Sequence, residues 1–386
     1  MTDIIPRKIL EKVTELRKTL HRHPEISGKE KNTAARIKQW LSRQEPDEII
    51  EGLGGHGLAA IFDSGKAGPT LLLRADLDAL PIDEVNTFKY KSENPGVSHK
   101  CGHDGHMAIL SGFAMILRKR RPAKGRIVLL YQPEEENGQG AAKVIKDKKF
   151  DKIKPDYAFA LHNLPGYKKN AVIMKEGPFA AASKGMIIKL QGRSSHAAHP
   201  EQGLSPVHMM KDLMEGLMHI PEKKELFKDF TLLTIIHARL GEIAFGTNPG
   251  KGVVMATLRT YRDDDMEILN KEARDLAHKL SEKHGISINI SYTEEFPATN
   301  NHPEASKYAF EAMKKAAVEA EHIDTPFRWS EDFGHFTGDN RGALFGIGSG
   351  IDHPSLHNHD YDFPDEILKT GMAMFYHIAD QIVTLK

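Results

Sequence analysis

The stretch Ser98-His-Lys-Cys-Gly-His-Asp-Gly-His106 carries side chains suited to bind a metal ion. It places Cys101, the only cysteine of the chain, two residues before His103. Glycines at positions 102 and 105 allow the backbone to turn tightly. A thiolate and imidazoles that converge on one turn are ligands that divalent metals of the zinc type prefer. Taken alone, the same pattern also fits a turn with an inert buried cysteine and surface histidines.

Further ligand-type side chains follow segments that read as buried strands. The strand 70–75 precedes Asp76, the strand 126–131 leads into Gln132-Pro-Glu-Glu-Glu136, and the strand 156–161 ends on His162. Strand, loop and helix alternate here, which predicts an α/β fold with a mixed, largely parallel sheet. In such sheets ligands bind beyond the carboxyl ends of the strands, so we expect these groups to meet.

Five side chains are enough to bind two neighbouring divalent ions. They come from the strand ends, from the cysteine turn and from the segment 356–363, and they are Cys101, His103, Glu136, His162 and His357. Two such ions can share a water, lower its pKa to roughly 7 and polarise a carbonyl oxygen. Glu135 is then the expected general base, which takes a proton from the water and passes it to the departing nitrogen. Consecutive residues of an extended strand point to opposite sides, which favours one ligand and one base.

Length and composition describe a globular protein of about two domains. The chain has 386 residues, and Lys plus Arg and Asp plus Glu each total 53. This balance gives no reason to expect a nucleic-acid or membrane partner. Charges interrupt the apolar positions of residues 1–20, so neither a signal peptide nor a spanning segment is expected. A single cysteine cannot form an intrachain disulfide, which favours the cytoplasm.

The pattern of predicted elements changes between residues 182 and 293. It runs strand 184–190, helix 205–220, strands 231–240 and 252–261, helix 265–283 and strand 286–292. This β-α-β-β-α-β order predicts a ferredoxin-like α+β domain. The expected organisation is a discontinuous metal-binding domain, 1–181 and 294–386, with an inserted lid domain at 182–293.

Two further patterns could indicate a binding site, a glycine pattern at 52–57 and the histidines at 21 and 23, but we do not interpret either in that way. Gly52-Leu-Gly-Gly-His-Gly57 matches a dinucleotide-binding pattern, but the following residues 58–62 read as a strand, where that motif requires a helix. Nucleotide binding is therefore not expected. His21 and His23 precede Pro24 and could line a site, but we favour a polar helix end.

Seven motifs together resemble the M20 metallopeptidase family, over nearly the whole chain: Arg74–Pro81, Cys101–His106, Gln132-Pro with its Glu pair, Leu161-His162, Gly192–Ala197, Ser330–Phe333 and Leu356-His357. The nearest branch contains the amidohydrolases of N-acyl amino acids, including hippurate and auxin-conjugate hydrolases. The resemblance implies a dinuclear site with the five ligands named above, Glu135 as base, and Asp76 behind the ligands. It also implies a lid domain that often mediates dimerisation. Because relatives usually have a small residue at position 134, the register within Glu134–Glu136 stays open.

The resemblance further implies substrate-binding residues in the lid domain. His196 would meet the substrate carboxylate or the oxyanion, in its own subunit or in a neighbouring one. Many relatives have Asn at the position of Gly246, so Asn248 is the candidate for that contact here. Arg259 is a candidate carboxylate clamp, because a guanidinium pairs bidentately with such groups. A surface ion pair is the alternative for Arg259.

These observations predict a metal-dependent amidohydrolase that cleaves N-acyl amino acids into a carboxylic acid and a free amino acid. The expected cofactors are two divalent ions per subunit, zinc or manganese first, with cobalt or nickel also suited. A homodimer or higher homo-oligomer through the lid domain is expected. The alternatives are a dipeptidase or carboxypeptidase of the same family, a cysteine hydrolase using Cys101 with His103, and a metal-binding protein without catalysis.

Overall fold

A computed structural model describes residues 4–338 and 340–386. The chain divides into two compact units. The first consists of Met1–Phe179, Thr299–Thr325 and Asp332–Lys386, and the second of Ala180–Ala298 and Pro326–Glu331. Each unit is described by itself.

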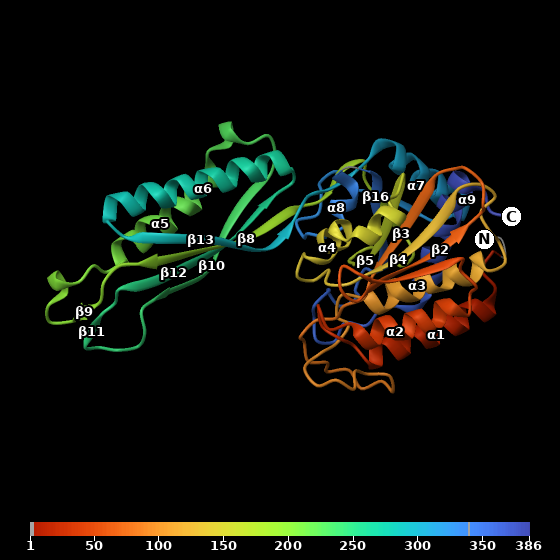
Figure 1. Cartoon of the computed structure of the whole chain (residues 1–386), viewed down its shortest axis with the longest axis horizontal. Helices are drawn as coiled ribbons and strands as arrows, with labels where there is room; N and C mark the ends of the chain where they lie inside the picture. Colours follow the sequence, from red (N-terminus) through yellow and green to blue (C-terminus); the bar gives the residue numbers. More distant parts are fainter. Residues whose placement is uncertain (1–3, 339) are drawn as a thin grey trace. The chain divides into compact units, whose positions relative to one another are not determined.

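A mixed sheet forms the centre of the first unit (Figure 1), with strand order β1-β2-β4-β3-β5-β16-β6-β15. The inner strands β4, β3, β5 and β16 run parallel, and β15 pairs parallel with β6. In contrast, β2 pairs antiparallel with both β1 and β4, and β6 pairs antiparallel with β16. Every residue of β3 is buried, as expected for a strand covered on both faces. The mixed, largely parallel α/β sheet is therefore confirmed. The strand bounds are β1 (Glu48–Leu53), β2 (Gly57–Asp63), β3 (Thr70–Asp76), β4 (Arg126–Gln132), β5 (Tyr157–Pro165), β6 (Val172–Met174), β15 (Ala320–His322) and β16 (Arg341–Gly350).

Five helices share one hydrophobic core with alternate residues of these strands: α1 (Arg7–Arg22), α2 (Lys31–Ser42), α3 (His103–Leu117), α7 (Pro303–Ala316) and α9 (Leu368–Val383). Figure 1 shows α1, α2 and α3 together on one side of the sheet. The shorter α4 (Gly140–Lys146) and α8 (Gly334–Gly338) contact β4 and β16. Two short 3-10 helices (Lys148–Lys152 and Asp365–Ile367) and a two-stranded ladder of β7 (Gly177–Ala180) with β14 (Thr299–Asn301) complete this part of the fold.

Several element ends differ for local reasons from those that the sequence predicts, which are a helix from about residue 107 to residue 118, a helix from about residue 304 to residue 320, and a strand that ends on His162. Helix α3 begins at His103 and not near residue 107, because Gly102 adopts a left-handed φ of 93° and turns the chain into the helix. The carboxylate of Asp104 then lies in the first turn, where the helix dipole favours it. Helix α7 ends at Ala316, since Ala317 takes a left-handed φ of 51°. Strand β5 does not end on His162 but continues to Pro165.

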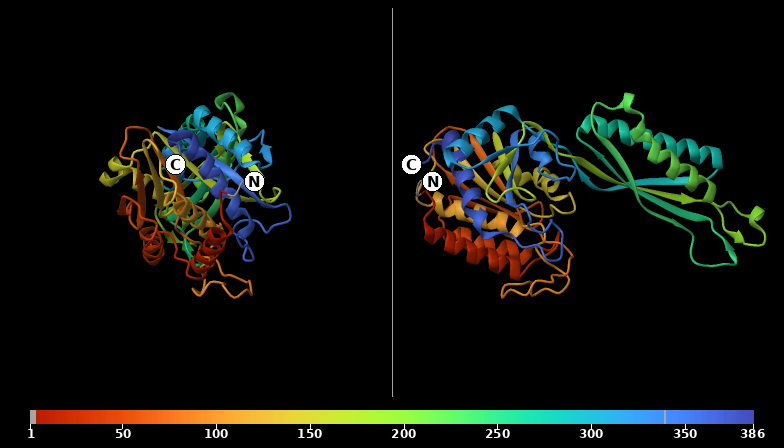
Figure 2. Two further views of the ribbon diagram at one scale, coloured as in Figure 1. Left: turned by 90° about the vertical axis from the view of Figure 1, so that its right-hand side faces the viewer. Right: turned by 180° about the vertical axis from the view of Figure 1, so that it is seen from behind.

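The second unit is an antiparallel sheet of order β10-β12-β8-β13, with both helices on one face (Figure 2, right). Its elements follow the order β8-α5-β10-β12-α6-β13, so the predicted β-α-β-β-α-β arrangement is confirmed. Apolar residues of the two helices pack against the strands in a separate core. The bounds are β8 (Ala182–Gln191), α5 (Val207–His219), β10 (Thr231–Leu240), β12 (Lys251–Thr260), α6 (Asp263–His284) and β13 (Ser287–Phe296), with short strands β9 (Ser195–His196) and β11 (Thr247–Asn248) and 3-10 turns Pro200–Gln202, Ile220–Glu222 and Lys224–Leu226.

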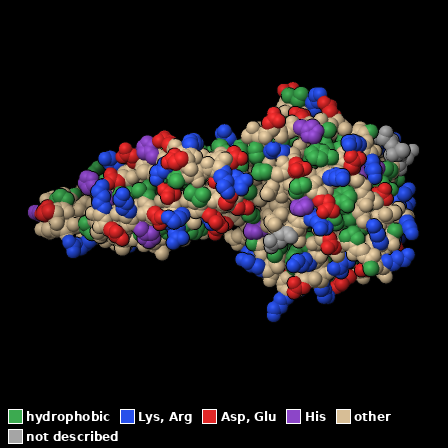
Figure 3. Space-filling view, turned by 90° about the horizontal axis from the view of Figure 1, so that it is seen from above, with side chains coloured by type: hydrophobic (Ala, Val, Ile, Leu, Met, Phe, Trp, Pro, Cys, Tyr) green, Lys and Arg blue, Asp and Glu red, His purple; other side chains and the backbone are tan. Residues whose placement is uncertain are grey.

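The surface agrees with the balanced composition. On the face shown in Figure 3, basic and acidic side chains are interspersed. Over the residues that the structure describes, no helix combines the length and apolar character needed to cross a membrane.

Candidate metal centre

The turn that carries Cys101 and His103 is held in a shape that only glycine permits at position 102. A Cβ at Gly102 would lie 2.4 Å from the side chain of Asn163. Next to it, His103 Nδ1 lies 2.9 Å from the carbonyl oxygen of Asp78, so this nitrogen is the N–H donor and Nε2 is left to act as a ligand.

Among the described residues, the buried polar atoms that lack a hydrogen-bond partner include His103 Nε2 in this turn and Glu136 Oε1 after β4. These two atoms lie 3.7 Å from each other. Because an unpaired buried polar atom costs about 1–3 kcal/mol, a native structure rarely leaves two together without a function. An imidazole nitrogen and a carboxylate oxygen left unpaired in this way are available as ligands of divalent metal ions.

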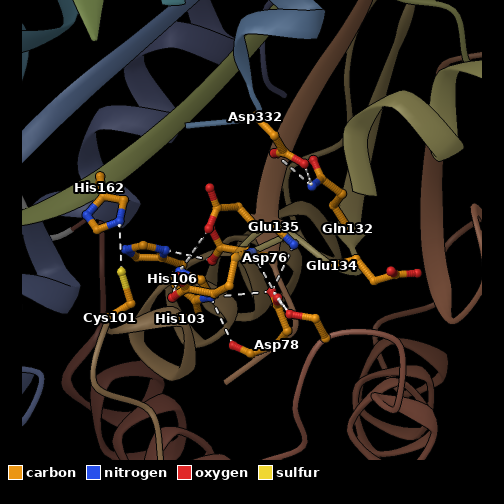
Figure 4. A network of polar contacts seen from close by, with 12 residues as sticks. Asp76, Asp78, Cys101, His103, His106, Gln132, Glu134, Glu135, His162 and Asp332 are labelled. Carbon is orange, nitrogen blue, oxygen red and sulfur yellow. Dashed lines mark hydrogen bonds and ion pairs between the residues drawn. The ribbon is translucent and has the colours of Figure 1, made fainter. Parts of the chain in front are cut away.

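A first group of candidate ligands joins the turn to β5 (Figure 4). The ligand atoms of Cys101, His103 and His162 all lie within 4.8 Å of one another. His162 Nε2 is 3.5 Å from Cys101 Sγ, and its Nδ1 lies 2.9 Å from the carbonyl oxygen of Asn163. Both imidazoles therefore present Nε2 to the centre and use Nδ1 for orientation.

A second group shares the same sulfur. Cys101, Glu136 and His357 also lie within 4.8 Å of one another by their ligand atoms. His357 Nε2 is 3.4 Å from Cys101 Sγ and 3.8 Å from Glu136 Oε2. The structure thus brings together all five residues expected to bind metal, in two groups that have Cys101 in common.

The three glutamates after β4 point in two directions. Glu134 adopts a φ of 55°, and its carboxylate accepts hydrogen bonds from Lys143 Nζ at 2.7 and 2.8 Å. Glu135 and Glu136 instead lie near His103 Nε2, at 3.9 and 3.7 Å respectively. A turn, fixed by main-chain N–H groups of 135 and 136 that donate to the carboxylate of Asp78, brings both to one side. Because β4 ends before the pair, the alternation of side chains along an extended strand does not apply to Glu135 and Glu136.

The pKa values of two candidate ligands, Glu136 and His103, are raised in this centre. Burial raises the pKa of Glu136 to about 7. Burial also disfavours the imidazolium of His103, but the carboxylates of Asp76 and Asp78 raise its pKa to about 10. A metal ion would have to displace the proton of His103, so metal binding is expected to release protons and to strengthen as the pH rises toward 10.

Behind the ligands lies a buried network of polar residues, of which the sequence predicted only Asp76. Asp76 Oδ1 is 2.7 Å from His106 Nδ1, and His106 Nε2 is 2.5 Å from Asn163 Oδ1. His106 follows His103 by one helical turn, and Asn163 follows His162. These hydrogen bonds therefore connect α3, which carries His103, to β5, which carries His162. The i, i+3 spacing of the two histidines is the sequence signal that could have found His106.

Asp76 is itself held by a buried arginine. Arg74 Nη1 donates to Asp76 Oδ2 at 2.6 Å, Nη2 donates to Asp332 Oδ1 at 2.8 Å, and Nε donates to Gln132 Oε1 at 3.0 Å. Figure 4 shows Asp332 and Gln132 joined above Asp76. The position of Arg74 thus fixes the ends of β3 and β4 relative to each other.

The expected substrate-binding residues lie in the second unit. His196 is on β9 and pairs with Thr247 of β11. Asn248 is on β11 and donates from Nδ2 to Ser195 Oγ at 3.1 Å. The side chain of His196 is exposed. The two short strands therefore bring His196 and Asn248 close together.

Arg259 is on β12, apart from that pair of short strands. Its Nη1 donates to the carbonyl oxygen of Arg328 at 2.8 Å and to Ser330 Oγ at 2.9 Å. Burial lowers the pKa of Arg259. The two hydrogen bonds from Nη1 hold the guanidinium of Arg259 against the segment 328–330.

Comparison with known proteins places this geometry in a family. The model of peptidase family M20/M25/M40 matches residues 72–381. The hippurate hydrolase of Campylobacter jejuni is 28% identical over 367 residues, which cover 95% of each chain. The N-acetyl-L-cysteine deacetylase of Bacillus subtilis is 31% identical over 348 residues, 89% of this chain and 81% of that protein. Among solved structures, the Bacillus subtilis YXEP protein, a dinuclear metal-binding peptidase from the M20 family, matches with a TM-score of 0.83, 24% identity and coverage of 98% and 99%.

Proposed function

Because the chain belongs to peptidase family M20/M25/M40 and is a metal-dependent hydrolase of amide bonds, we propose that its substrates are N-acyl amino acids. Hydrolysis would give a carboxylic acid and a free amino acid. The observation that carries this proposal is the pair of ligand groups that share Cys101, with Glu135 beside them. The activities named for the hippurate hydrolase and the N-acetyl-L-cysteine deacetylase support the substrate class.

The proposed cofactors are two divalent ions per subunit. The first would be held by Cys101, His103 and His162, and the second by Cys101, Glu136 and His357. Zinc or manganese suits this mixture of sulfur, nitrogen and oxygen donors, and cobalt or nickel is also compatible. When bound, such ions supply Lewis acidity toward water and toward an amide carbonyl.

Glu135 is the proposed general base. Its carboxylate lies 3.9 Å from His103 Nε2, so a water at the centre is within its reach. Glu135 would accept the proton of that water during attack on the amide carbon and then donate it to the leaving nitrogen. His103, Glu135 and His162 are buried, which strengthens these charge interactions.

His196, Asn248 and Arg259 are the proposed contacts of the substrate. The exposed imidazole of His196 and the neighbouring amide of Asn248 offer hydrogen-bond donors for a carboxylate or an oxyanion. Arg259 would pair with the carboxylate of the amino-acid part.

The substrate class is tested by matched pairs that differ only in a free α-amino group, such as acetyl-methionine against glycyl-methionine. We expect kcat/KM to be higher for the N-acetyl compound, since the proposal gives the acyl side no amine to recognise. Release of methionine is measured with each substrate at equal metal loading. Faster cleavage of glycyl-methionine would contradict the proposal and identify a dipeptidase.

We also propose that the protein resides in the cytoplasm, in keeping with its one free cysteine.

We further propose that the protein is a homodimer through its second unit. Strand β10 is an edge of the four-stranded sheet, and edges with apolar side chains pair readily with other strands. Ile236 on β10 is 60% exposed, and Ile243 and Phe245 after it are fully exposed. Exposed apolar side chains on an edge strand and in the segment after it make this part of the second unit the candidate interface.

Replacing Ile243 and Phe245 by aspartate is expected to convert the dimer into a monomer, because the charges would be desolvated in the interface. The molar mass in solution is measured by light scattering after size-exclusion chromatography. Val85→Asp is the matched control, since Val85 is 61% exposed in the first unit. A double variant that keeps the dimeric mass would exclude this surface as the interface.

A further inference from the structure

His21 is completely buried at the last turn of α1, although the sequence favoured a polar helix end there. Its two ring nitrogens face two different carboxylates. Nδ1 lies 2.9 Å from Asp104 Oδ2, and Nε2 lies 3.0 Å from Glu84 Oε1. None of these three residues belongs to the expected ligands of the metal centre.

The two contacts define the protonation state of the imidazole. Ionised carboxylates only accept hydrogen bonds, so both ring nitrogens must donate and His21 must be an imidazolium. Burial opposes this charge, but Asp104 and Glu84 raise the pKa of His21 to about 9. Arg17 Nη1, also on α1, lies 3.4 Å from Asp104 Oδ2 and 2.7 Å from Asp362 Oδ1, so the carboxylate of Asp104 has two cationic partners.

One contact of His21 leads to the residue directly after a ligand. Asp104 follows His103 in the first turn of α3. Because the carboxylate of Asp104 is fixed by His21, the backbone that carries His103 cannot rotate about the helix axis without breaking that ion pair.

The other contact leads to the residue directly before a ligand. Glu84 Oε1 accepts a hydrogen bond of 2.6 Å from Lys100 Nζ, and Lys100 precedes Cys101. Lys100 is completely buried and makes two hydrogen bonds with the loop 351–364, which follows β16. Its Nζ donates to the carbonyl oxygen of Tyr361 at 2.8 Å, and its own carbonyl accepts from the main-chain N–H of His357 at 2.8 Å.

We propose that His21 is a positioning residue of the metal centre, which holds both ends of the Cys101–His103 turn through Asp104 on one side and Glu84 with Lys100 on the other. Through Lys100 the same imidazole also fixes the backbone of His357. The inference rests on the proposed ligand set. Residues that orient ligands from behind typically contribute about 10- to 100-fold to metal affinity.

The test is the metal affinity of metal-free His21→Gln, measured by competition of Zn²⁺ or Mn²⁺ with a chromophoric chelator. A glutamine amide can donate to one of the two carboxylates but not to both, so we expect binding to weaken by about 10- to 100-fold. With saturating metal, kcat is expected to recover while KM stays unchanged. His23→Gln is the matched control, because His23 is partly exposed and, among the described residues, its one ion-pair partner is Glu93, 3.6 Å away.

The outcomes separate this inference from the proposed function. A folded His21→Gln variant that binds metal as tightly as the wild type overturns the inference, even if its melting temperature falls. A wild-type protein that binds no metal overturns the proposed function instead. If His21→Gln does not fold, Lys100→Met decides, since it keeps the aliphatic chain and removes only the ammonium group. Weaker metal binding by Lys100→Met supports the positioning role, and unchanged binding contradicts it.

Discussion

Replacing Glu135 by glutamine is expected to lower kcat by a factor of about 10² to 10⁴ while the metal ions stay bound. The amide has nearly the same shape as the carboxylate but cannot accept the proton of the attacking water. Glu136 lies at almost the same distance from His103 as Glu135 does, yet it also lies 3.8 Å from His357. We therefore assign the ligand role to Glu136 and expect the loss in Glu135→Gln to be catalytic.

Glu134→Gln is the matched control for this experiment. Its carboxylate pairs with Lys143 and is directed away from the centre, so its loss should change kcat by less than a few-fold. Metal content and kcat are measured on the same preparations of both variants. A Glu135→Gln enzyme with full metal content and wild-type kcat would show that another residue is the base.

The second large effect is expected from Cys101→Ala, because Cys101 is the only residue that belongs to both ligand groups. Its removal should weaken the binding of both ions, whereas His162→Ala and His357→Ala should each weaken only one. The number of metal ions per chain is measured after dialysis against dilute metal. We expect two for the wild type, one for each histidine variant and less than one for Cys101→Ala.

Equal loss in all three variants would contradict the shared sulfur and indicate a single cooperative site. Activity after chelation addresses the alternative of a cysteine hydrolase. Cys101 Sγ lies 3.5 Å from His162 Nε2 and 3.4 Å from His357 Nε2, and these contacts could also activate a thiolate nucleophile. A cysteine hydrolase would keep its activity after chelation, whereas the metal-dependent enzyme would lose it.

The larger elements could be predicted from sequence because their apolar patterns are regular. The strand 231–240 was predicted with the bounds that the structure gives to β10. The ends of α3 and α7 could not, since they depend on left-handed φ angles at Gly102 and Ala317. Helix α3 begins about one turn earlier than predicted, and this earlier start places His103 and His106 on the same helix.

The candidate ligands could be recognised because they follow strands whose carboxyl ends meet at one edge. Apart from Asp76, their supporting residues could not be recognised, since they act through partners far away in the sequence. Arg74 is connected to Asp332, and His21 is connected to Glu84 and Asp104. In the sequence such residues look like ordinary surface charges, and only the three-dimensional fold shows that they are buried and paired.

The central claim is that bound divalent metal enables this chain to release amino acids from N-acyl amino acids. The most direct test strips the enzyme with a chelator and follows the release of free amino acid from N-acetyl and N-benzoyl substrates before and after addition of Mn²⁺ or Zn²⁺. We predict no release by the stripped enzyme and full release when the metal is returned. Undiminished release without metal, or no release with any divalent metal, would contradict the claim.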